Sequence, residues 1–367
     1  MYSHPPPDIR AKHPYHMYDE IKEQPEAVIR SLELARLHGA EVARLLAGAR
    51  RIFVTGCGTS FHAALGTAWF LRSFSRGKMD ARAIEAFELV AYLPGLRPDD
   101  VVVALTHSGG TTMTVRALQR ARRSGCETVV ITGFPESEAA GIARHVLPTG
   151  FETERSWAHT ASYTAALTSA AAVANMLAEA EERVDLGPLP DLLQAVLEIE
   201  EAAHRLAAGV ILTERYREPS EMILVGGGPN AATAREGVLK LLETSYVRAS
   251  AFELEETLHG PLAAVTPDVL VMIVVPSGRS IDRSIELTRA LQALEVMPIV
   301  LTDEAHAGSF DETHRLVLPD IPEVLSPIPF IVPIQLFAYF LAVGRGINPD
   351  LLRRDDERYL KARQQYE

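Results

Sequence analysis

The sequence predicts an α/β protein with two doubly wound, flavodoxin-like parallel-sheet domains related by internal duplication. Apolar runs typical of buried strands alternate with segments of helical spacing, which favours a parallel sheet covered by helices on both faces. Two loops, residues 55–60 and 106–111, each follow such a run and open a helix. Landmarks also recur at one offset. Gly56 and Gly58 return 170 positions later as Gly226 and Gly228, Ser108 returns after 169 as Ser277, and Ile131 returns after 170 as Leu301.

The elements can be assigned in order along the chain. Proline and glycine at residues 184–190 interrupt two long helical patterns and predict the break between the domains. We expect an N-terminal arm and helix at 1–47, a first domain at 48–186, a second at 187–345 and a tail at 346–367. The expected strands lie at 51–55, 101–105 and 222–225, and the expected helices at 17–46, 61–71, 114–122, 160–183, 191–212 and 234–246. Pro25 marks a candidate break in the first of these helices.

Composition narrows the function classes. The 367 residues carry a formal net charge of −12, which argues against nucleic acid or an anionic membrane as the main partner. Two cysteines, Cys57 and Cys126, predict no disulfide framework and fit a reducing compartment. The first seven residues lack the basic and apolar pattern of an export signal, so we expect a cytoplasmic protein. The apolar run 328–343 is short for a membrane span and predicts a buried helix.

The two loops of the first half predict a phosphate cradle. Glycine allows close approach of the backbone to an anion, and a helix start presents unpaired N–H groups to it. The alternative is that the loop hydroxyls only cap helices. Residues 226–231 fit a dinucleotide fingerprint, but residues 246–250 offer no acidic residue at the end of the next strand, so no nucleotide cofactor is predicted. The candidate donors are Thr59, Ser60, Thr106, Ser108 and Thr111.

The second half carries the candidate chemistry. Glu236, Lys240 and Glu243 share one face of the helix expected at 234–246, although a surface ladder of ion pairs has the same spacing. An isolated histidine, His259, stands before a Gly-Pro turn. Two further histidines, at 13 and 16, lie in a proline-rich leader and are interpreted as solvated, so no metal is predicted.

These motifs together resemble the sugar isomerase (SIS) domains, especially the isomerase half of glucosamine-6-phosphate synthase. The resemblance runs from about residue 13 to the C-terminus and includes the step from Glu243 to His259. The motifs that carry it are residues 57–60, 108–111, 236–240, 243–246 and 259–261.

The resemblance implies a role for individual residues. Glu243 matches the carboxylate that moves a proton between C1 and C2, and Lys240 matches a lysine near the sugar. His259 matches the histidine that opens the ring and that reaches in from the neighbouring subunit, which implies a homodimer with shared sites. Contacts to a small phosphosugar fall on Gly58, Thr59, Ser60, Thr106, His107, Ser108, Thr111, Trp157 and His159.

The chain also departs from the synthase pattern. The printed chain has only the short arm before its first domain, so we do not expect glutamine as its unaided nitrogen donor. Gly110 and Ala161 replace polar residues, and the C-terminal Schiff-base lysine aligns with Glu357, so Lys361 substitutes only if the tail shifts. We therefore expect an isomerase-type enzyme for an amino-sugar or fructosyl-amine 6-phosphate, which aminates, deaminates or deglycates. The alternative is a noncatalytic sugar-phosphate sensor.

Overall fold

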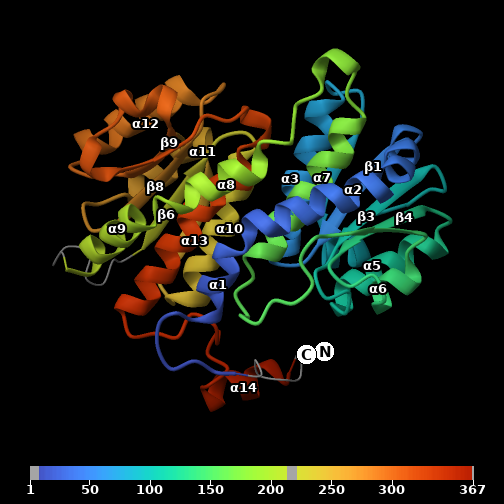
Figure 1. Ribbon diagram of the computed structural model, residues 1–367, viewed down its shortest axis with the longest axis horizontal. Helices are drawn as coiled ribbons and strands as arrows, with labels where there is room; N and C mark the ends of the chain where they lie inside the picture. The colour runs from blue at the N-terminus through green and yellow to red at the C-terminus, as the bar shows by residue number, and fades with distance from the viewer. Residues whose placement is uncertain (1–7, 213–220, 366–367) are drawn as a thin grey trace. The chain divides into compact units, whose positions relative to one another are not determined.

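The computed structural model describes residues 8–212 and 221–365 (Figure 1). These residues form two compact units. The first unit holds residues 23–154 and 159–190, and the second holds residues 8–22, 155–158, 191–212 and 221–365. Residues 1–7, on which the expectation of no export signal rests, lie outside the described part of the chain.

The first unit is built on a five-stranded sheet in the order β2-β1-β3-β4-β5, and every neighbouring pair is parallel. All six residues of β3 are buried, because this strand has neighbours on both edges and helices on both faces. The strands are β1 (Arg51–Gly56), β2 (Ala81–Glu85), β3 (Asp100–Leu105), β4 (Glu127–Thr132) and β5 (His145–Pro148).

Helices cover both faces of this sheet (Figure 1). Helix α7 is alanine-rich and almost entirely buried, because it packs between α2 and α3 on one face. Helix α5 lies on the other face and buries Val115, Leu118 and Ala121, while arginines end it where they suit the helix dipole. The helices are α2 (Gln24–Ala47), α3 (Thr59–Phe74) and α7 (Ala161–Met176) on the first face, and α4 (Ala86–Ala91), α5 (Thr112–Arg123) and α6 (Glu138–Ile142) on the second.

The second unit repeats this plan with the strand order β10-β9-β8-β6-β7, again all parallel. Counted within its own unit, each sheet has the order 2-1-3-4-5 of the flavodoxin-like fold. The predicted fold class, two duplicated doubly wound domains, is therefore confirmed. The strands are β6 (Met222–Gly226), β7 (Ala249–Glu253), β8 (Leu270–Val275), β9 (Ile299–Asp303) and β10 (Arg315–Leu318).

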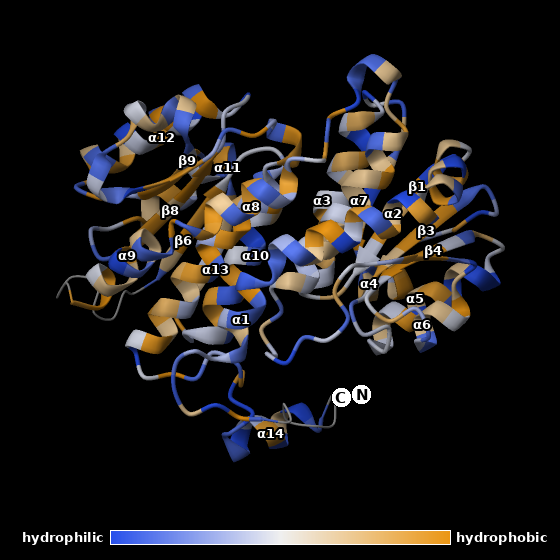
Figure 2. Ribbon diagram, in the orientation of Figure 1, coloured by the Kyte–Doolittle hydropathy of each residue, from blue (hydrophilic) through white to orange (hydrophobic). Residues whose placement is uncertain are grey.

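Helix α13 (Pro327–Gly344) is the central apolar helix of the second unit. Its length and composition would suit a membrane span, yet 89% of its residues are buried inside the protein. Figure 2 shows the hydrophobic colour concentrated on this helix and on the central strands. It packs beside α9 and α10, so the prediction of a buried helix at 328–343 is correct. The other helices are α1 (His16–Lys22), α8 (Leu189–Leu197), α9 (Glu200–Leu212), α10 (Asn230–Thr244), α11 (Leu254–Leu258), α12 (Ile281–Ala293) and α14 (Glu357–Arg363).

Three helical segments differ from the prediction in their limits. The segment expected at 17–46 is two helices, α1 and α2, which separate at Glu23, two residues before the candidate break at Pro25. Pro25 itself stands in the first turn of α2, where proline is tolerated. The pattern at 160–183 ends early, at Met176. The pattern at 191–212 divides into α8 and α9, and α9 begins on Glu200 and Glu201, whose charges favour a helix start.

Candidate functional site

The candidate site of the first unit begins where β1 and β3 end side by side. The chain leaves these two strands in opposite directions along the sheet, and such a switch point is where open α/β sheets bind ligands. Glycines permit the tight loops there. A Cβ on Gly56 would lie 2.7 Å from the backbone of Ser60, and Gly109 has φ +68 and would place a Cβ 1.9 Å from the Ser137 hydroxyl.

A small cavity of about 20 Å³ lies at this edge of the sheet. Five predicted binding residues line it together: Thr59, Ser60, Thr106, His107 and His159. Sequence reasoning missed four further polar lining residues, because no local motif marks them as site residues: Thr132, Thr149, Ser162 and Tyr163.

Two hydroxyls in the cavity wall are of particular interest. Thr106 and Thr149 are 2% and 4% exposed, and within the described residues neither hydroxyl has a hydrogen-bond partner. Buried polar atoms of this kind are uncommon and costly, so they need an explanation. The N-terminus of α3 points its positive end at the same place, and no side chain caps it. The wall is thus built from donors that suit an anion.

Three other predicted contacts stand near this cavity without lining it. Gly58 is the residue before α3 and has φ +56, where a side chain would be strained. The Ser108 hydroxyl accepts a hydrogen bond from Gly110 N at 3.3 Å, and Thr111 precedes α5 without capping it.

A chain of polar groups runs from the cavity into the first unit. The rings of His107 and His159 meet edge to face at 5.2 Å, and His159 Nδ1 lies 3.8 Å from a carboxylate oxygen of Glu154. Glu154 is fully buried and accepts hydrogen bonds from Thr160 N, Ala161 N and the Ser162 hydroxyl. Burial, and then the neighbouring His159, lower the pKa of His107 to about 4.

Trp157 belongs to the second unit, whereas the other predicted contacts belong to the first. Its backbone N donates to Asp350 O at 3.0 Å, and the guanidinium of Arg354 lies 3.6 Å from the centre of its ring. Arginine stacked on an aromatic face is a favourable contact. The C-terminal segment is therefore held against Trp157, which the sequence did not indicate.

The second unit buries the predicted acid and lysine. Lys240 is fully buried on α10 and pairs with Glu243 at 2.7 Å and with Glu236 at 3.3 Å. The Glu236 side chain is fully buried too, whereas that of Glu243 is 19% exposed. The alternative of a surface ladder is therefore wrong. Buried ion pairs cost desolvation and contribute little net stability, so their retention favours a chemical role.

His259 lies elsewhere on the same unit. It follows α11, its side chain is 70% exposed, and its Nε2 is 2.7 Å from Glu255. Arg283 holds the same carboxylate and is the main reason that the pKa of Glu255 falls to about 2. Within one chain the structure thus pairs Glu243 with Lys240 and His259 with Glu255.

The corresponding edge of the second sheet is filled by carboxylates. Asp303, fully buried, accepts hydrogen bonds from the backbone N and the hydroxyl of Ser277, the latter at 2.7 Å. His306 Nδ1 lies 2.7 Å from the same hydroxyl. Glu323 accepts from Arg279 N at 3.0 Å. These acids occupy the donors that a bound anion would need.

One step in the sequence argument against a dinucleotide is wrong. The strand after residues 226–231 is β7, and it ends on an acidic residue, Glu253. Its carboxylate caps α11, accepting from the N–H groups of Glu255 and Glu256. Glu85 ends β2 of the first unit in the same way and caps α4. These two acids therefore share a duplicated structural role, and the fingerprint is not supported as a cofactor site.

The lysine of the tail and the histidines of the leader have local partners. Lys361 lies on α14, is 69% exposed and pairs with Glu357 at 2.8 Å. His13 is exposed, and its Nδ1 lies 2.8 Å from the Tyr339 hydroxyl. The interpretation of the leader histidines as solvated is wrong for His16, which contacts the Asp8 carbonyl and is 1% exposed, because it begins α1 and this helix packs on α13. The described residues contain no cluster of three or more potential metal ligands.

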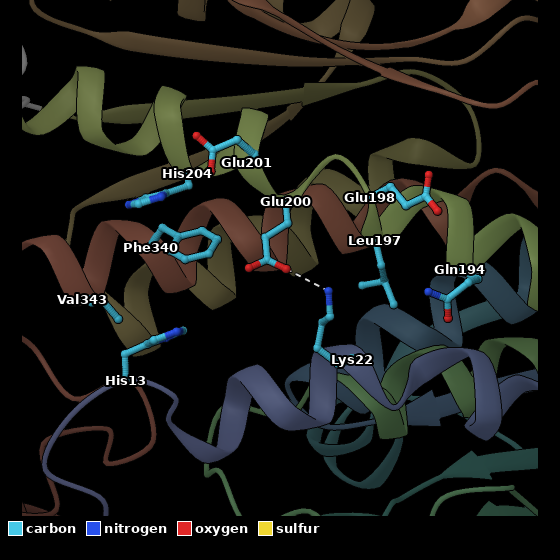
Figure 3. A pocket seen from close by; sticks show the side chains of 10 residues that line it. All are labelled: His13, Lys22, Gln194, Leu197, Glu198, Glu200, Glu201, His204, Phe340 and Val343. Atoms are coloured by element: carbon cyan, nitrogen blue, oxygen red, sulfur yellow. Dashed lines mark hydrogen bonds and ion pairs between the residues drawn. The ribbon is translucent and has the colours of Figure 1, made fainter.

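A wider cavity, of about 710 Å³, lies in the second unit beside α1, α9 and α13 (Figure 3). An ion pair between Lys22 and Glu200, 2.8 Å long, crosses its wall, and His204 stacks on Phe340. Glu198 and Glu201 also line it and would repel a phosphate. Its described lining includes none of the predicted site residues, most of which lie instead in two separate features, the smaller cavity of the first unit and the buried cluster on α10 of the second.

Comparison with known proteins gives one matching family. The SIS domain model matches residues 45–176 and 216–344. A glutamine–fructose-6-phosphate aminotransferase (isomerizing) of Pyrococcus horikoshii is 33% identical over 341 residues, 91% of this chain and 56% of that protein. The enzyme of the same name from Vibrio cholerae is 26% identical over 92% of this chain and 57% of its own length. The chain thus spans somewhat more than half the length of these relatives.

Solved structures share the fold. The C-terminal domain of glucosamine-fructose-6-phosphate aminotransferase from Francisella tularensis superposes with a TM-score of 0.84 at 23% identity, covering 92% of this chain and 98% of that one. Tagatose-6-phosphate ketose/aldose isomerase from Escherichia coli gives 0.80 at 23% identity, covering 94% and 96%. Glucosamine-6-phosphate deaminase from Thermotoga maritima gives 0.72 at 20% identity, covering 92% and 97%.

Proposed function

The chain belongs to the SIS domain family, and from this premise we propose that it is a phosphosugar isomerase-type enzyme for an amino-sugar or fructosyl-amine 6-phosphate. One observation carries the proposal most directly. The cavity of the first unit presents the unpartnered hydroxyls of Thr106 and Thr149 beside the uncapped start of α3. These donors suit the phosphoryl group of a sugar phosphate. At about 20 Å³ the cavity holds roughly one water molecule, so its side chains must move apart to admit that group.

The proton transfer is assigned to α10 of the second unit. Interconverting an aldose and a ketose needs a base that moves a carbon-bound proton and a cation that steadies the enediolate oxygen. Glu243 is the member of its buried cluster that reaches solvent, and Lys240 is held 2.7 Å from it. In this proposal Glu243 moves the proton between C1 and C2, and the Lys240 ammonium stabilises the charge that develops on oxygen.

Ring opening is assigned to His259 of a second copy of the chain. Within one chain this imidazole is exposed and paired with Glu255, so it needs another surface to meet a substrate. An imidazole accepts and returns protons near neutral pH, as opening a hemiacetal requires. We therefore propose a homodimer with shared sites, acting in the cytoplasm on a small phosphosugar.

The lysines favour a substrate whose amine is already attached. The chain has five lysines, and three of them are held outward by Glu200, Glu179 and Glu357. Lys240 is the buried one, and as an ammonium between two carboxylates it has no lone pair for attack on a ketose. This supports deamination or deglycation over condensation of a ketose with an enzyme lysine.

The test is amine release. The protein is incubated in D₂O with glucosamine 6-phosphate, with fructose 6-phosphate plus ammonia, and with several fructosyl-amine 6-phosphates, and free amine and sugar phosphates are measured. We expect at least one substrate to give free amine and a hexose phosphate, with deuterium at C1 or C2. Stabilisation by these ligands without amine release or deuterium exchange would instead establish a noncatalytic sensor.

A further inference from the structure

The cavity of the first unit has no permanent positive charge in its described wall. Its lining consists of apolar groups, hydroxyls and two imidazoles, and no lysine or arginine contributes to it. A phosphoryl dianion carries about two negative charges near neutral pH. Helix α3 offers only partial positive charge from its N-terminus. In this wall, His107 and His159 are the side chains that become cationic by taking up a proton.

The imidazoles of His107 and His159 lie next to each other, and the Glu154 carboxylate lies beside His159. His107 meets His159 at 5.2 Å, and His159 lies 3.8 Å from Glu154. Four donors hold Glu154 in place, two of them from Thr160 and two from the start of α7. The other titratable group facing this cavity is Tyr163 of α7. Thr132, at the end of β4, and Thr149, directly after β5, add hydroxyls to the wall.

In the protein without ligand this pair holds His107 neutral. Burial, together with the neighbouring His159, lowers its pKa to about 4. An anion placed in the cavity acts in the opposite direction, because a nearby negative charge favours the protonated imidazole. The free site therefore has the capacity to bind a proton that it does not hold at neutral pH.

We propose that the His107–His159 pair takes up one proton when a phosphoryl dianion enters this cavity, and so serves as its titratable cation. The inference rests on the proposed function, because it takes this cavity as the phosphoryl site. Since the bound state holds more protons than the free state, affinity must fall as pH rises. The fall is up to about tenfold for each pH unit, until the pair no longer takes up the proton.

Sulfate is the sharpest probe, because it stays a dianion across the range and brings no proton of its own. Its binding to the full-length protein is measured by calorimetry from pH 5.5 to 8.5, in pairs of buffers with different ionisation enthalpies. The buffer dependence of the heat gives the number of protons taken up. We expect uptake approaching one proton per site at the acid end, and displacement of sulfate by fructose 6-phosphate to show which site is occupied.

Two variants and a control complete the experiment. His107→Gln keeps hydrogen-bonding groups without titration, and His159→Gln removes the other half of the pair, so one can replace the other if it fails to fold. In each, uptake should disappear and affinity should vary less than about twofold with pH. His145→Gln is the control, because His145 lies on β5 of the same unit beside Glu41 and Glu127, outside the cavity lining. It should behave as the wild type.

The outcomes separate this inference from the proposed function. Competitive binding of sulfate and fructose 6-phosphate without proton uptake would overturn the role of the histidine pair and leave the phosphoryl site standing. Uptake that persists unchanged in both variants would also overturn it. If neither sulfate, fructose 6-phosphate nor glucosamine 6-phosphate binds to the wild type, the phosphoryl site itself is wrong and both proposals fail.

Discussion

The two units end their central strands in the same way, but they differ in whether a carboxylate accepts the hydrogen bonds of the donor groups at that edge of the sheet. In the first unit Gly133 follows β4, and the hydroxyls of Thr106 and Thr149 face a cavity without a partner among the described residues. At the position 170 residues after Gly133 the second unit has Asp303, whose buried carboxylate accepts both donors of Ser277. The first edge keeps hydroxyls without a partner among the described residues, and at the second edge the protein's own acid accepts the donors.

This difference shows that two copies of one fold can carry different polar groups at the same edge of the sheet. Both sheets present backbone and hydroxyl donors at the same place, because the same strand order brings the same loops together. A carboxylate in reach of those donors stabilises the loop and excludes an anion by charge. In the proposed function the first unit, whose described cavity lining has no such carboxylate, keeps its donors for a substrate, and the second unit supplies the reacting groups on α10.

The largest effect is expected from a substitution of Glu243 on α10, to which the proposal assigns the proton transfer. In the proposed mechanism Glu243→Gln removes the proton acceptor, so turnover should fall at least about a hundredfold while affinity for fructose 6-phosphate changes little. Steady-state kinetics and calorimetry measure the two quantities. Glu286→Gln, an exposed acid on α12, is the matched control. Near-normal turnover in Glu243→Gln would remove α10 from the mechanism.

His259→Asn should lower turnover to a similar degree, and it also tests whether the site is shared between copies. Neither Glu243→Gln nor His259→Asn should be active alone. Mixing the two under conditions of subunit exchange should recover up to about one quarter of wild-type turnover, because a mixed dimer then contains one intact site. If mixing recovers nothing although exchange is shown by mass, Glu243 and His259 act within one chain or not at all.

Removal of the carboxylate at the edge of the second sheet should lower the stability of the protein and leave its substrate binding unchanged. Asp303→Ala leaves the Ser277 backbone N–H without its acceptor, while the Ser277 hydroxyl keeps His306 as a partner, and we expect a loss of about 1–3 kcal/mol in the free energy of unfolding. The Michaelis constant should stay within about twofold, because this edge holds no substrate in the proposal. Urea unfolding followed by circular dichroism gives the stability. A large rise in the Michaelis constant with unchanged stability would reverse the assignment of the two edges.

Removal of a hydroxyl at the edge of the first sheet should weaken substrate binding without lowering stability. Thr106→Val deletes a buried hydroxyl that has no partner among the described residues, so the free energy of unfolding should stay the same or rise. Affinity for fructose 6-phosphate should weaken about tenfold through the lost hydrogen bond. Thr302→Val is the control, because its hydroxyl is equally buried and unpartnered in the described part of the second unit. If the two variants weaken binding alike, the cavity is not the binding site.

The smallest effect is expected at Cys57. It lies directly after β1, and burial raises the pKa of its thiol to about 11, so little thiolate exists at pH 8. Cys57→Ala should change turnover less than about twofold, and native protein should react slowly with iodoacetamide. Loss of activity on selective alkylation of Cys57 would bring this side chain into the site.

The architecture was largely readable from the chain. Apolar runs and glycine loops repeated at one offset predicted both sheets, because buried parallel strands need continuous apolar sequence and tight turns need glycine. The helix limits were less well predicted. Where α7 ends and α8 separates from α9 depends on packing and on caps, which a spacing pattern does not contain.

The candidate site was readable only in part. Thr59, Ser60 and Thr106 belong to loop motifs, and their convergence follows from the strand order. The assignment of Trp157 to the second unit, and its stacking with Arg354, could not be predicted, because they depend on segments far apart in the chain. The acidic residue at the end of β7, Glu253, was not predicted, because strand pairing extends β7 three residues past the segment 246–250.

By itself the sequence determined the repeated α/β fold and the loops in which hydroxyls and glycines stand together, because local spacing and residue type specify strands, turns and helix starts. Tertiary structure alone decided which donors are satisfied. It placed Asp303 against Ser277 in one unit and left Thr106 facing a cavity in the other, and it buried Lys240 between two acids. Hydrogen-bond partners and desolvation are properties of groups brought together in space, and they decide which of two similar edges can bind an anion.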